Sequence, residues 1–502
     1  MYRSPLTPTT HHSQLTNPMN HLLVKNIGLL VVDHHGKPCL CGKEMAQLDV
    51  LNNAWLLVED GRVKDWGGLP LSPSKRRGEP DTDGSAEPPL LLEGDGGRLD
   101  GGRLEVDAHG GAVLPSFCDS HTHLVYADSR EGEFVDKIRG LSYAEIARRG
   151  GGILNSADRL HELSEDELYR QAMRRIDEII RKGTGAVEIK SGYGLNLDDE
   201  LKMLRVIRRI RDTAPLKVMA TFLGAHAVGR AFAGRQGDYV NHVINDMIPE
   251  VGRQGLADFI DVFCDEGFFT PEETSRMLEA GLKWGLRGKI HGQELADSGG
   301  VEVAVKHGAL SVDHLESMTE ADIRLLSEEL RVKSEEFATA VPSAETTAVA
   351  NSTLYTLHST LPTDSSLFTL HSSLPTVPTA LPGTSFFLNM PFAPGRKIID
   401  AGLPLATASD YNPGSTPSGD MKFVVSLACI KMRLLPPEAI NAATLNTAAA
   451  MGLSHDYGSL HPGKVANFFI TDPIPGIDYI PYAYTQPIIR RVFLEGKEYH
   501  AL

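Results

Sequence analysis

Residues 184–226 read TGAVEIKSGYGLNLDDELKMLRVIRRIRDTAPLKVMATFLGAH, with a short apolar run at each end. Between these runs, 198–212 places Leu201, Leu204 and Ile207 on one face of a helix. Two apolar runs joined by an amphipathic helix are typical of neighbouring parallel strands in one sheet. The stretch therefore predicts one strand-helix-strand unit.

The same alternation continues in both directions along the chain. The helix that precedes this unit, 165–183, places Leu168, Ala172, Ile176, Ile179 and Ile180 on one face and ends at Gly183. Eight apolar runs share the pattern, at 111–121, 184–190, 216–226, 259–267, 288–292, 309–315, 379–385 and 404–410. Eight such units predict an α/β fold in the form of a closed (β/α)8 TIM-like barrel, rather than an open doubly wound sheet.

Both ends of the chain have a different texture. Short β-like runs separated by glycine-rich turns fill 22–114, which favours antiparallel hairpins, and similar runs follow residue 453. We therefore expect a small β-sandwich satellite domain built from 21–114 and 454–502. The hydrolase barrel is then expected at 115–453.

Three segments are expected to lie outside these packed units. Residues 1–20 are polar and contain proline, and 72–102 are rich in Gly, Pro and charge. The stretch 331–376 is rich in Ser and Thr and holds a near-duplication, STLYTLHSTLP followed by SSLFTLHSSLP. We interpret it as a low-complexity insertion between the sixth and seventh strands. Its role and that of the acidic loop near residue 80 cannot be read from the sequence.

Composition excludes several classes of function. The formal net charge of -16, from 49 basic and 65 acidic residues, disfavours nucleic-acid binding. The five cysteines are few, odd in number and not spaced as metal knuckles, which favours reduced thiols in the cytoplasm. No run of apolar residues is long enough to span a membrane, and residues 1–20 lack the apolar core that a signal peptide needs. The oligomeric state, a homodimer among the alternatives, is left open.

Residue types that bind metals follow the ends of four predicted strands. His121 and His123 end the first, and a strand's period of two places both imidazoles on the same face. His291, His314 and Asp410 lie at three further strand ends. Each alone can equally be a structural histidine or a helix cap. In a barrel all of them converge on one axial pocket, so together they predict a metal site.

The same residues suggest a hydrolytic mechanism. In such barrels a second metal ion is usually held by a lysine or a glutamate on the fourth strand. That strand holds no lysine here, and Asp265 and Glu266 lie at its edge, so one metal ion is favoured over two. A metal ion lowers the pKa of bound water toward ~7. Glu294, three residues after His291, can move the proton, and Asp410 can share that work. His314, where it is not a ligand, can polarise the carbonyl under attack.

Several motifs together resemble the imidazolonepropionases, a family in the amidohydrolase superfamily. They are LPSFCDSHTHLVYADSREGEF, ARRGGGIL, EIKSGYGL, TFLGAHAV, KIHGQELADSGG, VDHL, LPGTSFFL and ATASDYNPGSTPSGDM, spread over about 113–470. The resemblance implies hydrolysis of the cyclic amide 4-imidazolone-5-propanoate to N-formimidoyl-L-glutamate, in histidine degradation, with one divalent or trivalent zinc or iron ion.

The resemblance also implies residue roles. The metal ligands would be His121, His123, His291 and Asp410, and the substrate contacts would come from Arg130, Tyr193, His226, Glu294, Asn412, Gly414 and Ser415. Arg130 suits the anionic propanoate because its guanidinium binds carboxylates with two hydrogen bonds. His226, at the end of the third strand, can donate to the carboxylate or the ring. The glycines beside Tyr193 allow backbone to approach a ligand, or form a tight turn.

Two other functions remain to be weighed. A related deaminase acting on a guanine-like or cytosine-like ring would use nearly the same His and Asp residues, but a neutral base does not require Arg130 and Tyr193. A catalytically silent barrel that serves as a scaffold typically loses metal ligands, and this chain retains them all. The cyclic amidohydrolase is therefore favoured.

Overall fold

The barrel predicted from the repeated units is present in the computed structural model, which describes residues 21–68, 103–141, 145, 151–340 and 374–500. Its eight parallel strands follow one another in sequence order around the sheet. They are β6 (Phe117–Asp119), β7 (Thr184–Lys190), β8 (Lys217–Ala225), β9 (Phe259–Cys264), β10 (Arg287–Gly292), β11 (Ser311–His314), β12 (Val377–Ala380) and β13 (Ala406–Thr407).

The first and last strands meet just beyond their own ends. The amide of Asp410 donates to the carbonyl of His121 at 2.9 Å, and the amide of His123 donates to the carbonyl of Tyr411 at the same distance. These bonds close the barrel at its carboxyl end, so that residues following β6 and β13 face the same axial space.

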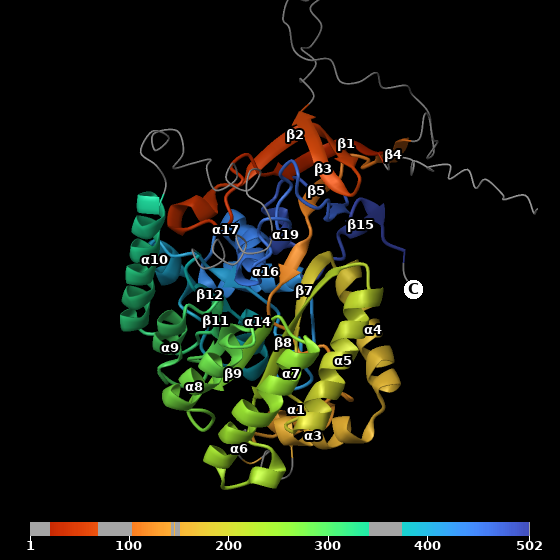
Figure 1. The fold of residues 1–502 in the computed structure, drawn as a ribbon. Coiled ribbons are helices and arrows are strands. Elements are labelled where there is room, and N and C mark those ends of the chain that lie inside the picture. Colours follow the sequence, from red (N-terminus) through yellow and green to blue (C-terminus); the bar gives the residue numbers. More distant parts are fainter. Residues whose placement is uncertain (1–20, 69–102, 142–144, 146–150, 341–373, 501–502) are drawn as a thin grey trace, which may run out of the picture.

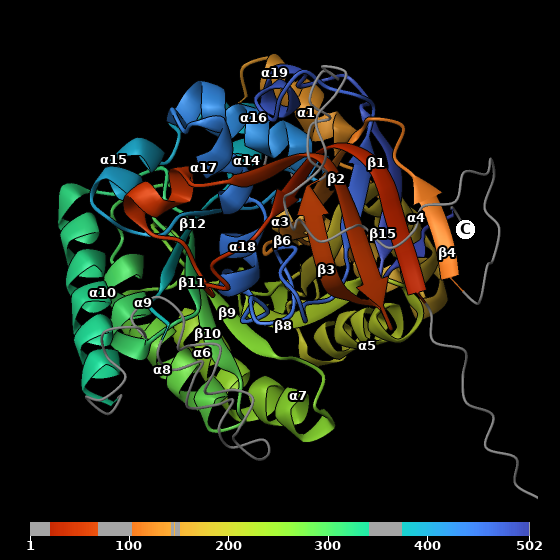
Figure 2. The same cartoon turned by 90° about the horizontal axis from the view of Figure 1, so that it is seen from above.

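Helices cover the outside of the barrel (Figures 1 and 2). Both helices predicted around the first unit are present, as α4 (Glu165–Arg181) and α5 (Leu197–Thr213), with the expected residues buried. The others are α1 (Glu131–Ile138), α3 (Ile153–Glu162), α6 (Gln236–His242), α7 (Ile248–Gln254), α8 (Pro271–Leu282), α9 (Gly300–His307), α10 (Glu320–Ala340), α14 (Pro382–Leu388), α15 (Gly395–Asp400), α16 (Met421–Met432), α17 (Pro436–Ala442), α18 (Leu445–Ala450) and α19 (Tyr479–Tyr482).

Strands from both chain ends form a second sheet at one end of the barrel (Figure 1). Its order is β16-β15-β14-β5-β1-β2-β3, and β4 also pairs with β1. The strands are β1 (His21–Val32), β2 (Asp49–Glu59), β3 (Arg62–Gly68), β4 (Arg103–Asp107), β5 (Ala112–Pro115), β14 (Phe468–Thr471), β15 (Ile489–Leu494) and β16 (Lys497–Glu498). Segments more than 350 residues apart therefore share one sheet and one apolar core.

Three details differ from the expectations. The first apolar run is divided, because Ala112–Pro115 pairs in the end sheet whereas Phe117–Asp119 pairs in the barrel. β1, β2 and β3 are antiparallel as expected, but β4 and β5 run parallel to β1. The seventh strand ends at Ala380, and α14 begins at Pro382.

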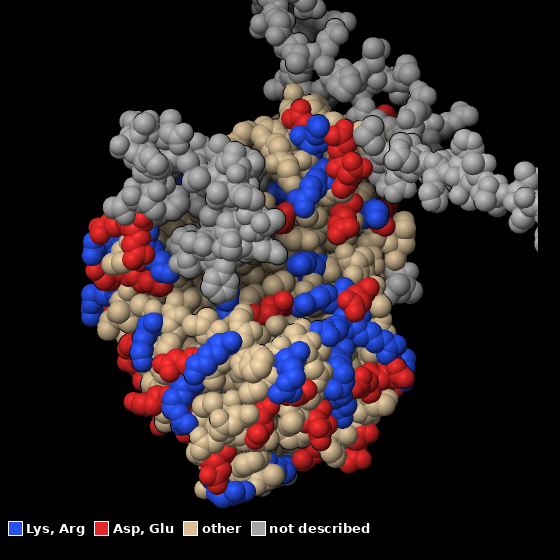
Figure 3. Space-filling model, viewed as in Figure 1, with Lys and Arg blue, Asp and Glu red and all other residues tan. Residues whose placement is uncertain are grey.

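Of the segments expected to be unpacked, 1–20, 72–102 and 341–373 lie outside the described residues. Helix α10 extends to Ala340, so the first residues of the Ser/Thr-rich stretch are helical. On the face shown in Figure 3, basic and acidic side chains are interspersed over the described part of the barrel. Among the described residues, no helix is both long and apolar enough to cross the bilayer.

Candidate active site

A cavity of about 550 Å³ lies at the carboxyl ends of the barrel strands. The residues that the sequence predicted as metal ligands, catalytic groups or substrate contacts line it, except His121, which is fully buried beneath it. The predicted residues on its wall are His123, Arg130, Tyr193, His226, His291, Glu294, His314, Asp410, Asn412, Gly414 and Ser415. This is the end at which barrel folds place their active sites.

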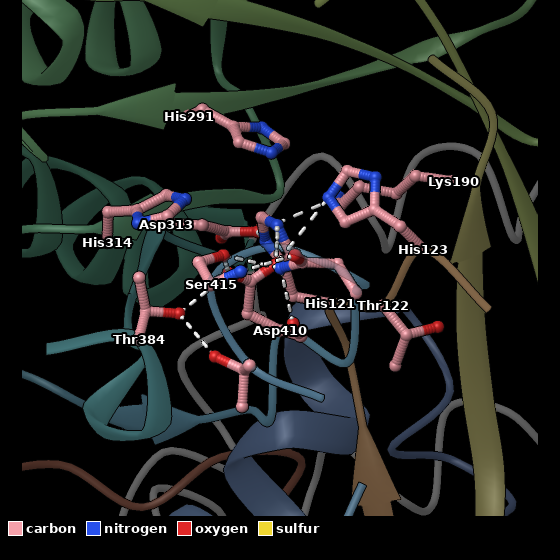
Figure 4. A network of polar contacts seen from close by, with 12 residues as sticks. His121, Thr122, His123, Lys190, His291, Asp313, His314, Thr384, Asp410 and Ser415 are labelled. Atoms are coloured by element: carbon pink, nitrogen blue, oxygen red, sulfur yellow. Dashed lines mark hydrogen bonds and ion pairs between the residues drawn. The ribbon is translucent and has the colours of Figure 1, made fainter. Parts of the chain in front are cut away.

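The predicted metal-binding residues converge at the bottom of this cavity (Figure 4). The His121 and His291 rings have centroids 4.3 Å apart, and His123 lies 5.6 Å from His291. One carboxylate oxygen of Asp410, Oδ1, is 3.6 Å from Nε2 of both His121 and His123. Three overlapping triads could each hold a metal ion: His121, His291 and His314; His123, His226 and His291; and His121, His123 and Asp410.

Neighbouring groups orient each of these side chains. Nδ1 of His121 donates to Asp313 at 2.7 Å, and Nδ1 of His291 lies 2.9 Å from Asp261, so Nε2 of both rings points to the cavity. Within the described residues, neither of these buried Nε2 atoms has a hydrogen-bond partner. Buried imidazole nitrogens rarely stay unpaired, and several that face one another beside a carboxylate fit a bound cation.

Asp410 is held by hydroxyl groups on the side away from the histidines. Thr384 donates to its Oδ2 at 2.6 Å, and Ser415 donates to the same oxygen at 3.1 Å. Oδ1 is thereby turned toward His121 and His123. A carboxylate fixed in this way presents one oxygen as a ligand and accepts hydrogen bonds through the other.

Left-handed backbone occurs at three strand ends around the site. Gln293, His314 and Asp410, which follow or end β10, β11 and β13, have φ angles of 54°, 87° and 54°. Residues other than glycine seldom adopt such angles, and strained backbone of this kind gathers at functional sites.

A buried acid and an imidazole lie beside the metal-binding residues. Burial and the nearby carboxylates of Glu316 and Asp410 raise the pKa of Glu294 well above its usual value. Nδ1 of His314 is 3.6 Å from Glu294 and 3.7 Å from Glu316. Burial and the other histidines keep the pKa of His314 well below its usual value, so this ring is neutral. Glu294 can therefore carry a proton near neutral pH.

Arg130 also lines the cavity, at the start of α1. Its side chain is only 8% exposed and its Nη1 is 3.7 Å from Glu133. Its buried Nε has no hydrogen-bond partner in the described part of the chain. Lys137 lines the same cavity, and its ammonium donates to the carbonyl of Gly414 at 3.0 Å. A lysine close to a guanidinium with an unsatisfied donor suits an anionic ligand.

Tyr193 and His226 line the cavity next to His123. The His226 ring stacks on His123 with centroids 5.1 Å apart, and Nδ1 of His226 donates to the carbonyl of Gly192 at 3.0 Å. Burial lowers the pKa of His226 to about 3, so the ring is neutral and its Nε2 can only accept. The predicted donation from His226 to the carboxylate or the ring of the substrate requires a donor on the ring nitrogen that faces the cavity. While Nδ1 donates to Gly192, Nε2 can accept from a ring N–H.

The glycines beside Tyr193 make room for protein rather than for a ligand. A Cβ on Gly192 would lie 2.9 Å from Nδ1 of His226, and one on Gly194 would lie 2.3 Å from the amide of Glu200. The buried Glu200 carboxylate accepts from the amides of both glycines. This turn therefore fixes the positions of Tyr193 and His226.

The loop after β13 is held together from within. Asn412 donates to Ser415 Oγ at 2.6 Å and to the carbonyl of Asp410 at 2.7 Å, and its Oδ1 accepts from the amides of Gly414 and Ser415. A Cβ on Gly414 would lie 1.3 Å from the Arg130 guanidinium. Only glycine at this position leaves the space that Arg130 occupies.

Sequence reasoning missed the charged residues beneath the histidines. Five side chains inside the barrel are fully buried and ionisable: Glu188, Lys190, Asp261, Lys289 and Asp313. Each interrupts an otherwise apolar parallel strand, and that interruption was the available signal. Asp265, weighed as a ligand for a second metal, instead accepts from the amides of Glu294, Leu295 and Ala296.

Comparison with known proteins adds independent information on ancestry. The amidohydrolase family model matches residues 112–498. An imidazolonepropionase from Christiangramia forsetii is 44% identical over 95% of this chain and 99% of its own length. One from Geobacillus kaustophilus is 40% identical over 78% of this chain and 82% of its own length.

Solved structures with the same fold are more distant. Guanine deaminase from E. coli superposes with a TM-score of 0.61 at 13% identity, covering 96% of this chain and 99% of that one. An adenosine deaminase from Xanthomonas campestris with bound zinc gives a TM-score of 0.56 at 15% identity, covering 96% and 93%. At this identity the likeness concerns the fold alone.

Proposed function

The chain belongs to the amidohydrolase family and, within it, to the imidazolonepropionases, and from this premise we propose how its residues act. The reaction is hydrolysis of the cyclic amide C–N bond of 4-imidazolone-5-propanoate, which gives N-formimidoyl-L-glutamate. The observation that supports the assignment of roles is the set of side chains that line one cavity. Histidines with unpaired nitrogens lie at its bottom, and an arginine with an unpaired donor lies on its wall.

His121, His123, His291 and Asp410 would hold one metal ion, either zinc or iron. The imidazole and carboxylate donors suit both metals. When bound, such an ion supplies Lewis acidity and lowers the pKa of water toward ~7. Asp265 is occupied by three backbone amides, which supports a single ion rather than a pair.

Substrate binding is assigned to side chains that line the cavity. Arg130 binds the propanoate, which satisfies its buried Nε. Tyr193, whose own ring packs beside His226, contacts the ring of the substrate. His226 accepts from a ring N–H through Nε2. Asn412, Gly414 and Ser415 act together as the loop that faces the substrate and leaves room for Arg130.

The proton steps are assigned to the buried acid and imidazole. Glu294 takes a proton from the attacking water and returns it to the ring nitrogen as the C–N bond breaks, which its raised pKa allows. His314, between Glu294 and Glu316, stabilises the oxygen on which negative charge develops. Asp410 shares the proton transfer through the oxygen that faces the histidines.

We also propose the division of labour along the chain. The barrel at 115–453 carries the chemistry, and 21–114 with 454–502 form the satellite domain. All five cysteines are free, which suits a reducing compartment such as the cytoplasm. The partner is a small anionic molecule.

The test is an ultraviolet assay of imidazolonepropanoate consumption, run beside guanine and cytosine, with elemental analysis of the same sample. We expect turnover of imidazolonepropanoate alone. Deamination of guanine or cytosine would instead support the related deaminase.

His121→Ala should lose bound metal and turnover together, because its Nε2 takes part in two of the three triads. Metal content and kcat are measured on the same preparation. Full activity in metal-free protein would contradict the assignment.

A further inference from the structure

The interior of the barrel, one layer below the histidines, is an ionic network instead of an apolar core. Lys190 donates to Glu188 at 2.6 Å and to Asp261 at 2.8 Å, and lies 3.8 Å from Asp313. Lys289 pairs with Glu188 and donates to the carbonyl of Ser120 at 3.0 Å. All five charged side chains are completely buried. Barrel interiors are normally filled by branched apolar residues, so this layer calls for an explanation.

Strand geometry connects this layer to the one above it. Lys289 and His291 are two residues apart on β10, so both point into the barrel, one below the other. His291 is paired in register with Asp313 on β11, and Lys289 with Asp261 on β9. Asp261 lies 2.9 Å from Nδ1 of His291, and Asp313 accepts from Nδ1 of His121 at 2.7 Å. Figure 4 shows Lys190 and Asp313 beside these rings.

Charge explains why a lysine lies between the aspartates. Burial works against the charge of Lys190, but the carboxylates of Asp261, Glu188 and Asp313 outweigh it and hold the pKa of Lys190 above its usual value. The ammonium in turn compensates the charges of the Asp261 and Asp313 carboxylates, which lie 2.8 and 3.8 Å from it. Without Lys190, two buried carboxylates would face each other with less compensation, and such groups move or take up protons.

We propose that Lys190 is a positioning residue for the metal site. Its ammonium holds the Asp261 and Asp313 carboxylates in place. Asp313 fixes the tautomer of His121 through a hydrogen bond, and Asp261 directs the His291 ring through an ion-pair contact with Nδ1. Both Nε2 atoms are thereby aimed at one point before any ion arrives. The inference rests on the proposed metal-dependent function, but it concerns a residue that touches neither metal nor substrate.

The test compares Lys190→Met with Lys464→Met. Lys464 is equally buried but lies in the satellite domain, just before β14, where it donates to Ser459 at 2.8 Å. Each variant loses one buried amino group, so Lys464→Met controls for the general cost of that loss. Zinc affinity is measured by competition with a chromophoric chelator, and the visible absorption of the cobalt-substituted protein reports ligand geometry.

Lys190→Met should bind zinc about 10- to 100-fold more weakly than the wild type, which is the usual effect of disturbing groups that orient ligands. Its cobalt spectrum should change, whereas Lys464→Met should match the wild type in both measurements. Equal zinc affinity and an unchanged spectrum in Lys190→Met would overturn the proposal.

A second variant covers the case in which Lys190→Met does not fold. Asp313→Asn keeps the shape of the side chain but removes the charge that faces Nδ1 of His121, and it should also weaken zinc binding. Wild-type affinity in Asp313→Asn would then overturn the proposal. Wild-type protein that bound no metal and consumed no imidazolonepropanoate would instead contradict the proposed function.

Discussion

At the scale of single residues, the substrate-binding arginine depends on a glycine almost 300 positions away. Gly414 has no Cβ, and the Arg130 guanidinium fills the space that a Cβ would need. Nη2 of Arg130 would lie 1.3 Å from that atom. The sequence showed Arg130 and Gly414 as separate parts of two motifs. Their dependence on each other follows only from the fold.

Gly414→Ala should therefore displace Arg130 and raise KM for imidazolonepropanoate about tenfold, the loss of one charge-assisted contact, while metal content is unchanged. Steady-state kinetics and elemental analysis check both quantities. Gly132→Ala is the matched control, because nothing lies within 4 Å of the Cβ that it would add. An unchanged KM in Gly414→Ala would show that Arg130 does not bind the propanoate.

At the scale of elements, the site is assembled from strand ends and from the loops that other strands hold. The loop after β10 carries Glu294, yet its anchor is Asp265, just beyond the end of β9. That carboxylate accepts three backbone hydrogen bonds from residues 294–296. The position of the proton-transfer group is thus set by the neighbouring strand.

Asp265→Asn replaces an acceptor-only carboxylate by an amide with one acceptor oxygen, so part of this anchor is lost. We expect kcat to fall about 10- to 100-fold because Glu294 is less well placed, with zinc affinity close to that of the wild type. Single-turnover rates and zinc titration measure the two effects. A large loss of zinc affinity would instead indicate that Asp265 helps to hold the metal.

The sequence predicted the strands and the candidate site, but not every pairing between strands. Hydrophobic periodicity predicted all eight barrel strands and the two helices α4 and α5, since burial of one face repeats with a regular spacing. Polar residues that end apolar runs gave the candidate site. Periodicity did not show that Ala112–Pro115 and Phe117–Asp119 pair in different sheets, because both halves are equally apolar. It also did not show the ionic layer, which depends on contacts between β7, β9, β10 and β11.

At the scale of the whole molecule, charged residues connect the two ends of the chain. Lys464 donates to Ser459 at 2.8 Å, and Ser459 donates to Asp33 at 2.7 Å. Asp33 follows β1 and Lys464 precedes β14, so the contact joins residues about 430 positions apart. Burial lowers the pKa of Lys464 from 10.5 to about 8.

This shift has a defined consequence for stability. Between about pH 8 and 10.5 the unfolded chain binds one more proton at Lys464 than the folded protein does, so the free energy of unfolding rises with pH, by about 1.4 kcal/mol per unit. Lys464→Met should abolish this contribution. Denaturant unfolding of both proteins across that range gives the difference. Parallel curves would contradict the lowered pKa.

The divided strand has a mechanical consequence for the active site. β5 and β6 are one continuous ribbon, broken only at Ser116, that leaves the end sheet and runs directly to His121 and His123. Sliding this ribbon by one residue against β14 would turn every side chain on it to the opposite face. The end sheet therefore sets the register of this segment in the barrel. Trimming the chain near its carboxyl terminus should displace His121 and His123, which lie far from the cut.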